Sequence, residues 1–386
     1  MSNSVAMPRI LEFGEDATAR LPDIVKGFNA SRVLVLTDKT MVQMGYVAMV
    51  TELLSNAGIN SRVYSNTIPE PTSQSIEEAV AVTRDNQIDC IVALGGGSAI
   101  DSAKAISMLA SYGGFMRDYK APRIVNETSI PVIAIPTTAG TGSEVTKFTI
   151  ITDSDTDEKM LCIGLGFLPV AALIDYKLTM SLPPRITADT GIDALTHAIE
   201  AYVSKKGNPF SDYNALEAMR LIAPNLRKVF HDGNDIEARK QMMMGSTLAG
   251  IAFSNASVAL VHGMSRPIGA SFHVPHGLSN AMLLPSITAF SIPACEERYA
   301  QCAKAMGIVG EHVRTEDANT RLKQELLALN EELNVPTLAE FGVEKDDFDA
   351  VLDIMIQQAF ASGSPGNNPR VPTEEEMRSL YQRLWK

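Results

Sequence analysis

Short apolar runs that alternate with helix-like segments are the feature that most restricts the fold of this chain. Three of the first four runs are apolar over several consecutive residues, which is typical of parallel strands covered by helices on both faces. Segments between them carry apolar side chains at three- and four-residue spacing, as in 47–58 and 72–87. The strand-like runs are RVLVLTD (32–38), SRVYS (61–65), DCIVALGGG (89–97) and PVIAIPTT (131–138). This order predicts an open parallel sheet of the α/β class.

The pattern changes after VAALIDY (170–176), where the pair Pro183-Pro184 follows. From there to Lys386 the sequence has an almost continuous helical pattern and is rich in Ala, Leu and Met. A chain of 386 residues is also longer than one hydrophobic core usually supports. We therefore expect two domains, an α/β domain over residues 1–180 and an all-α domain over residues 181–386.

Charge and composition exclude several classes of partner. The formal net charge is −12 and no cluster of Lys and Arg is present, so we expect no nucleic-acid partner. No long segment is free enough of charge to cross a bilayer, so we expect no membrane association. The first residues, MSNSVAMPRILEFGED, do not have the pattern of a secretory signal, which favours the cytoplasm. The four scattered cysteines contain no CxxC pair, which indicates buried thiols.

A glycine run stands at the end of one strand-like segment, in ALGGGSAIDSAKAI (93–106). Gly95, Gly96 and Gly97 let the backbone approach an anion closely, and Ser98 opens a helix whose first N–H groups would point at it. We expect a phosphate group to bind there. Tight turns between a strand and a helix also use glycine, so the run alone is a weak signal.

An acidic partner for the glycine run stands before it in the sequence. Asp38 ends the run 32–38, at the edge of the sheet where α/β proteins bind ligands. An acid that precedes the glycines is in the wrong order for a simple Rossmann unit, so a dinucleotide would need a differently connected sheet. Asp38 could equally cap a helix that begins near Lys39.

A second loop suited to anions follows the run 131–138, in TTAGTGSEVT (137–146). Its two glycines and five hydroxyl residues offer many donors to a phosphate or a ribose. No lysine follows the glycines as in a Walker A motif, so we expect binding of a nucleotide without phosphoryl transfer.

Histidines are concentrated in two stretches of the helical half. In ITADTGIDALTHAIEAYV, Asp193 and His197 are four residues apart and share one face of a helix. In VALVHGMSRPIGASFHVPHGLSNAML the histidines are His262, His273 and His276. One carboxylate with several imidazoles suits Fe(II), Zn(II) or a similar divalent ion. Taken alone, Asp193 and His197 are more simply interpreted as two interacting residues of the core or the surface than as metal ligands.

With these residues in view, the chain resembles the iron-dependent (group III) alcohol dehydrogenase family over essentially its full length. The motifs that carry the resemblance are GGGSAIDSAKAI, PTTAGTGSEVT, GIDALTHAIEAY, AFSNASVALVHGM and PHGLSNAMLLP. The resemblance implies an N-terminal α/β dinucleotide-binding domain and a C-terminal all-helical metal domain. It also implies a homo-oligomer, with a dimer as the minimum.

The resemblance assigns roles to individual residues. It implies that Asp38 favours NAD over NADP and that Lys159 reaches the cofactor ribose. It implies a pyrophosphate site at the glycine run, formed by Gly95, Gly96, Gly97 and Ser98. The residues that it places along the cofactor are Thr137, Thr138, Thr141 and Ser143. The metal ligands that it implies are Asp193, His197, His262 and His276.

One departure from the family pattern affects catalysis. Many relatives have a second histidine four residues after the one in HGM, and here that position is Arg266. His273 therefore becomes the candidate relay for the alcohol proton. Arg266 could recognise an anionic substrate, bind the cofactor, or pair with a neighbouring carboxylate.

The activity implied by the resemblance is reversible hydride transfer between a small-molecule alcohol and NAD, giving an aldehyde or ketone. The metal would be Fe2+, with Zn2+ as the alternative. Three other functions stay open at this point. They are a metal- and NAD-dependent lyase of the dehydroquinate synthase type, a hydroxy-acid dehydrogenase that uses Arg266 to bind a carboxylate, and a nucleotide-binding protein without catalysis.

Overall fold

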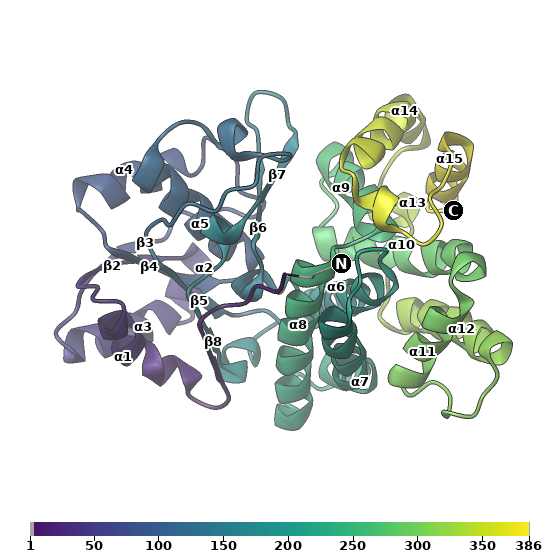
Figure 1. Ribbon diagram of the computed structural model, residues 1–386, viewed down its shortest axis with the longest axis horizontal. Coiled ribbons are helices and arrows are strands. Elements are labelled where there is room, and N and C mark those ends of the chain that lie inside the picture. Colours follow the sequence, from purple (N-terminus) through teal and green to yellow (C-terminus); the bar gives the residue numbers. More distant parts are fainter. Residues whose placement is uncertain (1–3, 386) are drawn as a thin grey trace. The chain divides into compact units, whose positions relative to one another are not determined.

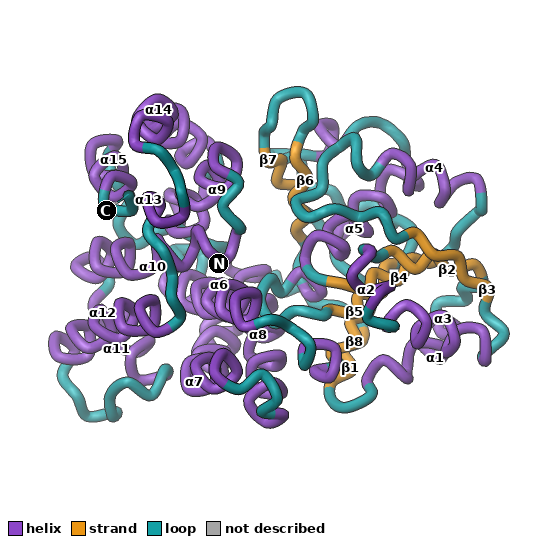
Figure 2. The backbone as a smooth tube through the Cα atoms, turned by 180° about the vertical axis from the view of Figure 1, so that it is seen from behind, coloured by secondary structure: helices purple, strands orange, loops and turns teal. Residues whose placement is uncertain are grey.

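The computed structural model describes residues 4–385, so residues 1–3 and 386, at the outer ends of the two expected domains, lie outside the described residues. The chain forms two compact units, and the first comprises residues 6–181. The second comprises residues 182–385 together with residues 4 and 5 at the start of the chain. The strands lie in the first unit, and the regular elements described in the second are all helices, joined by loops (Figures 1 and 2). The α/β and all-α classes expected from the sequence are confirmed.

A six-stranded parallel sheet forms the centre of the first unit, in the order β1-β8-β5-β4-β2-β3. The four runs expected to be strands are β2, β3, β4 and β5. β2 lies between β3 and β4, with Val35 opposite both Val63 and Val92. The strands are β1 (Ile10–Phe13), β2 (Arg32–Leu36), β3 (Asn60–Tyr64), β4 (Cys90–Gly95), β5 (Val132–Pro136) and β8 (Ala171–Ile174).

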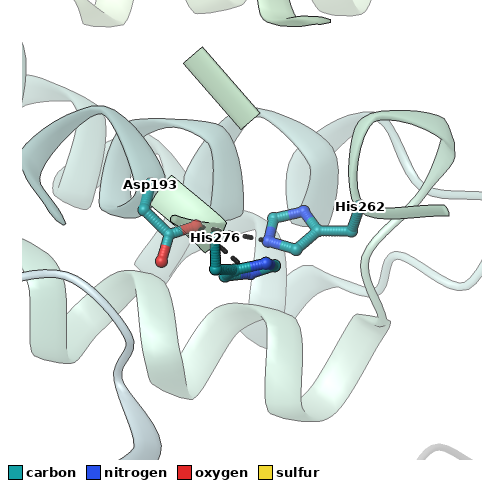
Figure 3. A group of neighbouring side chains, drawn as sticks. All are labelled: Asp193, His262 and His276. Atoms are coloured by element: carbon teal, nitrogen blue, oxygen red, sulfur yellow. Dashed lines mark ion pairs between the residues drawn. The ribbon is translucent and has the colours of Figure 1, made fainter. Parts of the chain in front are cut away.

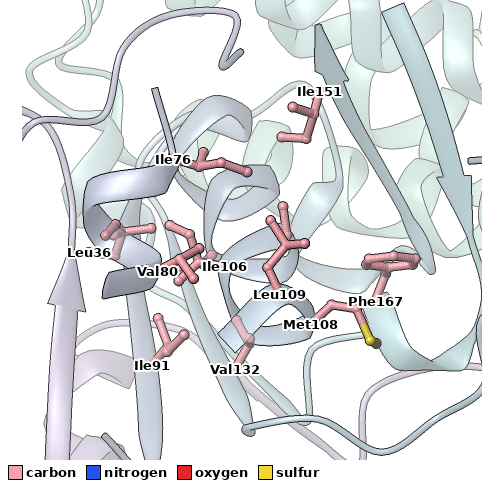
Figure 4. Packing of buried hydrophobic residues seen from close by; sticks show 14 of the residues in the cluster. Leu36, Ile76, Val80, Ile91, Ile106, Met108, Leu109, Val132, Ile151 and Phe167 are labelled. Atoms are coloured by element: carbon pink, nitrogen blue, oxygen red, sulfur yellow. The ribbon is translucent and has the colours of Figure 1, made fainter. Parts of the chain in front are cut away.

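Helices cover both faces of this sheet, which explains the uninterrupted apolar runs. In β2, Val33 and Val35 face a cluster that includes α1 and α3, while Leu34 and Leu36 face the cluster of α4 and α5. Figure 4 shows the second cluster, where Ile106 of α5 packs among the strand residues. The helices of this unit are α1 (Leu21–Gly27), α2 (Lys39–Gln43), α3 (Tyr46–Asn56), α4 (Glu77–Asp85) and α5 (Gly97–Tyr112).

The sequence analysis did not predict four short strands. One is β8, whose four residues are all buried and lie within the segment 170–176, where the change of pattern was placed. β1 is four residues long and lies at one edge of the sheet, so it has too few residues to show a period. β6 (Phe148–Thr152) and β7 (Lys159–Ile163) form a separate antiparallel hairpin. Their buried and partly exposed positions alternate, so they lack the continuous apolar run of the central strands.

The second unit is built around α6, in which most side chains from Thr187 to Val203 are buried. Pro184 is its first residue, where proline suits a helix because the first N–H has no intrahelical acceptor. The helices are α6 (Pro184–Val203), α7 (Pro209–His231), α8 (Ile236–Ala256), α9 (Leu260–Phe272), α10 (His276–Ser291), α11 (Glu296–Ala305), α12 (Thr315–Glu332), α13 (Leu338–Phe341), α14 (Lys345–Ala361) and α15 (Glu374–Gln382).

Among the described residues, no single helix combines the length and apolar character needed to span a membrane. The pair α8 and α9 meets these criteria only when taken together, and the two helices are bent by 102° at the break between them.

Candidate functional site

Three helices of the second unit bring a carboxylate and two imidazoles together. Asp193 comes from α6, His262 from α9 and His276 from α10 (Figure 3). Their ligand atoms all lie within 4.8 Å of one another. The Oδ1 atom of Asp193 is 3.4 Å from Nε2 of His262 and 3.8 Å from Nε2 of His276. Asp193 and His262 are buried, and His276 is partly exposed.

His197, the fourth expected ligand, lies next to this cluster. Its Nε2 is 3.8 Å from Oδ1 of Asp193, one helical turn earlier on α6. Its ring stacks on His262 at 4.4 Å between centroids, and on Phe253 at 4.2 Å. The structure therefore places His197 beside the other three expected ligands, whose ligand atoms all lie within 4.8 Å of one another.

The distances and charges of the cluster fit a divalent ion. A tetrahedral ion with bonds of about 2.1 Å holds its ligand atoms roughly 3.4 Å apart, close to the 3.4 and 3.8 Å observed. Burial would raise the pKa of Asp193, but the imidazoles of His197, His276 and His262 outweigh this effect and lower the pKa. Asp193 is therefore a carboxylate, which is the form that binds cations.

Asn280, four residues after His276 on α10, faces the same cluster. Its Nδ2 donates a hydrogen bond of 2.7 Å to Oδ1 of Asp193 and lies 3.2 Å from Nε2 of both His262 and His276. Its Oδ1 is buried and has no hydrogen-bond partner among the described residues. Nearly all buried polar atoms in proteins are paired, so this orphaned oxygen marks the cluster as a polar site that is incomplete by itself.

In the first unit, the glycine run joins β4 to α5 as expected. Gly95 has φ of +153°, a conformation that L side chains rarely adopt. Gly96 is the N-cap residue of α5, and no side chain caps the helix at that position. The first N–H groups of this 16-residue helix are therefore available to an anion.

The threonine loop packs directly against the glycine run. The N–H of Thr137 donates to the carbonyl of Gly95 at 3.0 Å. A Cβ atom added to Gly97 would lie 2.7 Å from Cγ2 of Thr141, and one added to Gly96 would lie 3.4 Å from Cγ2 of Thr138. Glycine is thus needed at Gly97 because the neighbouring loop leaves no room for a side chain.

We expect Gly97→Ala to weaken NAD binding, because the added methyl group must push Thr141 aside and disturb both loops. The loss should be about 10-fold, equivalent to about 1.4 kcal/mol. Thr141→Ser removes the methyl group that the new Cβ meets, so the double variant should recover part of the affinity. Fluorescence titration with NADH measures both effects. Equal affinity of wild type and Gly97→Ala would show that the contact is irrelevant to the cofactor.

Asp38 caps a helix and also lies beside the glycine run. Its Oδ1 accepts hydrogen bonds from the N–H groups of Thr40 (2.7 Å) and Met41 (3.1 Å), so it caps α2. Its Oδ2 lies 3.6 Å from the position of a Cβ on Gly95. β2 and β4 are neighbours in the sheet, which is why the carboxylate reaches the glycine run despite its distance in sequence.

Ser98 and Lys159 are connected through Glu70. The Nζ atom of Lys159 donates to Oε2 of Glu70 at 2.8 Å, and the N–H of Glu70 donates to Oγ of Ser98 at 3.3 Å. Both expected cofactor residues thus belong to one polar cluster beside the glycine run.

The hydroxyl of Ser143 points into the protein interior. It donates to Asp101 and accepts a hydrogen bond of 2.8 Å from Lys104. Lys104 also donates to the carbonyl of Phe148 at 2.7 Å, and burial lowers its pKa to about 8. These bonds tie the threonine loop to α5 and to the start of β6. A contact between Ser143 and a cofactor would have to use its backbone.

Comparison with known proteins identifies the family that the sequence matches. The sequence profile described as "Iron-containing alcohol dehydrogenase" matches residues 8–176, and "Fe-containing alcohol dehydrogenase family, C-terminal" matches residues 187–385. The chain belongs to the iron-containing alcohol dehydrogenase family. The family resemblance seen in the sequence motifs is therefore confirmed.

Relatives of this family match along the whole chain. Lactaldehyde reductase of Escherichia coli (strain K12) is 36% identical over 388 residues, covering 100% of both chains. Long-chain-alcohol dehydrogenase 1 of Geobacillus thermodenitrificans (strain NG80-2) is 38% identical, covering 98% of this chain and 95% of its own. The crystal structure of a 1,3-propanediol oxidoreductase superposes with a TM-score of 0.95 and 32% identity, covering 100% of both chains.

These relatives are named as dehydrogenases and reductases. Membership of this family does not favour a lyase of the dehydroquinate synthase type, nor a hydroxy-acid dehydrogenase. It places the chain among oxidoreductases that act on CH–OH groups.

Of the two expected catalytic residues, Arg266 lies in the middle of α9 and His273 lies at its C-terminal end. Arg266 is partly buried and donates to Oγ of Ser364 at 3.2 Å, and burial lowers its pKa. Its Nε is buried and has no hydrogen-bond partner among the described residues. His273 is exposed in the left-handed conformation that ends α9, three residues before His276.

Sequence reasoning missed three polar residues that contact the expected site. Glu200 accepts a hydrogen bond from His262, Asn280 contacts three of the four expected ligands, and Glu70 binds Lys159. Helical spacing could have revealed the first two, since Glu200 follows His197 by three residues and Asn280 follows His276 by four. Glu70 lies in a loop, where no period indicates its direction.

Proposed function

We propose that this protein catalyses reversible hydride transfer between a small-molecule alcohol and NAD, giving an aldehyde or ketone and NADH, with a divalent metal ion. The observation that carries the proposal is the convergence of Asp193, His262 and His276 from three helices, in a chain of the iron-containing alcohol dehydrogenase family.

We assign Asp193, His197, His262 and His276 as the metal ligands. Three imidazoles and one carboxylate bind Fe2+ and Zn2+ alike, and the family description favours Fe2+. The ion, when bound, supplies Lewis acidity that polarises the oxygen of an alcohol or carbonyl group. The protein holds the ligands in place before binding, because burial and stacking leave the rings of His197 and His262 little freedom.

The cofactor residues belong to the other unit. The N–H groups at the start of α5, together with Gly95, Gly96, Gly97 and Ser98, bind the pyrophosphate of NAD. Thr137, Thr138, Thr141 and Ser143 line the cofactor, while Lys159 and Asp38 bind its ribose groups. This assignment is supported by the packing of the threonine loop on the glycine run and by the position of Asp38 beside Gly95.

His273 is the proposed relay for the alcohol proton, since it is exposed and lies close in sequence to His276. Within the described part of the chain, Arg266 donates one hydrogen bond, to Ser364, and we assign it a structural role beside the site. Relatives are named for lactaldehyde, long-chain alcohols and 1,3-propanediol, so the substrate class here is an alcohol or aldehyde. A cytoplasmic location and a homodimer or larger homo-oligomer remain part of the proposal.

Metal reconstitution tests the proposed function. Protein freed of metal under anaerobic conditions is combined with Fe(II), Zn(II), Mn(II) or Ni(II), with a panel of alcohols, and with NAD or NADP. We expect net NADH formation, followed at 340 nm, only with a divalent ion present. NADH formation that survives complete metal removal would contradict the metal assignment. Turnover without net NADH would instead indicate a lyase.

A further inference from the structure

Glu200 lies on the same face of α6 as two of the proposed metal ligands. It follows Asp193 by seven residues and His197 by three, and both spacings bring side chains to one side of a helix. The residue is only 2% exposed. An acidic side chain this deeply buried requires partners, and none of the roles proposed above involves it.

The carboxylate of Glu200 accepts three hydrogen bonds from the beginning of α9. Oε2 accepts from the N–H of Ala259 at 2.9 Å and from Nδ1 of His262 at 2.7 Å. Oε1 accepts from the N–H of Val261 at 2.6 Å. Ala259 is the N-cap residue of α9 and has no side chain that could cap the helix. Glu200 therefore caps α9 from a neighbouring helix and holds one of its histidines at the same time.

These contacts determine which nitrogen of His262 carries the proton. A carboxylate accepts hydrogen bonds, so Nδ1 must donate to Glu200. On the opposite side of the ring, Nε2 lies 3.2 Å from Nδ2 of Asn280. The orientation of that amide follows from its 2.7 Å bond to Oδ1 of Asp193, because a carboxylate requires the NH2 group to face it. Nε2 thus faces this donor and, at 3.4 Å, the Oδ1 atom of Asp193, so with Nδ1 held by Glu200 the other ring nitrogen is directed at the cluster.

We propose that Glu200 is a positioning residue of the metal centre, which fixes His262 in the tautomer protonated on Nδ1 so that Nε2 presents its lone pair to the ion. The inference rests on the proposed metal function. Carboxylates that bind the far nitrogen of a metal-binding histidine typically raise metal affinity by about 10- to 100-fold.

The test compares Glu200→Gln with Asp212→Asn. Glutamine has nearly the same shape as glutamate, but its NH2 group must face either the N–H of Val261 or the pair formed by the N–H of Ala259 and Nδ1 of His262. Its single oxygen is also a weaker acceptor than a carboxylate, so the variant holds the Nδ1 tautomer of His262 less firmly. Asp212→Asn is the same carboxylate-to-amide change in α7, at a residue that binds Arg298 and is not among the ligand contacts described above. Affinity of the metal-free proteins for Zn2+ is measured by competition with a chromophoric chelator, without alcohol or NAD.

We expect Glu200→Gln to bind Zn2+ about 10- to 100-fold more weakly, with little change in Asp212→Asn. NADH binding should be retained in both variants. A Glu200→Gln protein that unfolds at lower temperature yet keeps its Zn2+ affinity would reduce Glu200 to a helix cap and overturn the proposal.

Nitrogen-15 NMR of the imidazoles provides a readout that does not depend on how well the variant folds. In the metal-free wild type, His262 should carry a proton on Nδ1, and a ring protonated on Nε2 alone overturns the proposal. Failure of the proposed function has a different signature, since the wild type would then bind Zn2+ normally but form no NADH from any alcohol. A wild type that binds none of the tested ions would overturn both.

Discussion

His262→Ala should abolish metal-dependent alcohol oxidation and leave NADH binding intact. The substitution removes one of the three ligand atoms that converge within 4.8 Å. Losing an outer partner of a ligand already costs about 10- to 100-fold in metal affinity, so losing the ligand itself should cost more. The variant also leaves the carboxylate of Glu200 without one of its three donors, which should lower the free energy of unfolding by about 1 to 3 kcal/mol.

His231→Ala is a matched control for this prediction. His231 lies on the helical unit too, but its side chain is 59% exposed and pairs with Glu332. Metal content, Zn2+ affinity and NADH formation should match the wild type in this control. If His262→Ala turned over alcohol at the wild-type rate with any divalent ion, His262 could not be a ligand required for catalysis.

Substitution of Asp38 should change the choice between NAD and NADP. A hydrogen bond from a ribose hydroxyl to a carboxylate contributes about 1.5 to 3 kcal/mol, so its loss should lower kcat/KM for NAD by about 10- to 100-fold. The same carboxylate would repel the 2′-phosphate of NADP. We therefore expect Asp38→Gly to raise kcat/KM for NADP while lowering it for NAD.

Asp38→Asn separates cofactor choice from helix capping. Asparagine caps helices as well as aspartate does, so the variant should keep the bonds to Thr40 and Met41 but lose the charge. Its relative use of NADP should increase, although less than in Asp38→Gly, because the volume of the side chain remains. Measurement of kcat/KM with NAD and with NADP gives the cofactor preference of each variant, and the thermal unfolding temperature shows whether the cap of α2 is kept. An unchanged cofactor ratio in both variants would show that Asp38 serves only α2.

Much of the fold could be predicted because its signals are local. The apolar runs of β2, β4 and β5 follow from burial on both faces, and the three-to-four spacing of α3 follows from burial of one face. The hairpin β6–β7 was missed because its alternating burial over five residues per strand gives a short and weak pattern. The family was identified from the sequence motifs, because the apolar patterns alone could not have indicated it.

The candidate site was also predictable only in part from local sequence signals. Sequence alone determined that Asp193 and His197 share a helix face, because α-helical spacing is set by the backbone. It could not determine which later histidines join them. His276 reaches Asp193, while His273, three residues earlier, is exposed at the end of α9.

Only the tertiary structure decided the contacts between helices. The packing of α6, α9 and α10 brings His262 and His276 to Asp193 and brings Glu200 to the first residues of α9. In the sheet, the pairing of β2 with β4 carries Asp38 to the glycine run. Spacing along one helix or strand follows from the geometry of its own backbone. Contact between elements depends instead on the combined packing of many side chains that are far apart in the sequence, and a single sequence does not show which of them meet.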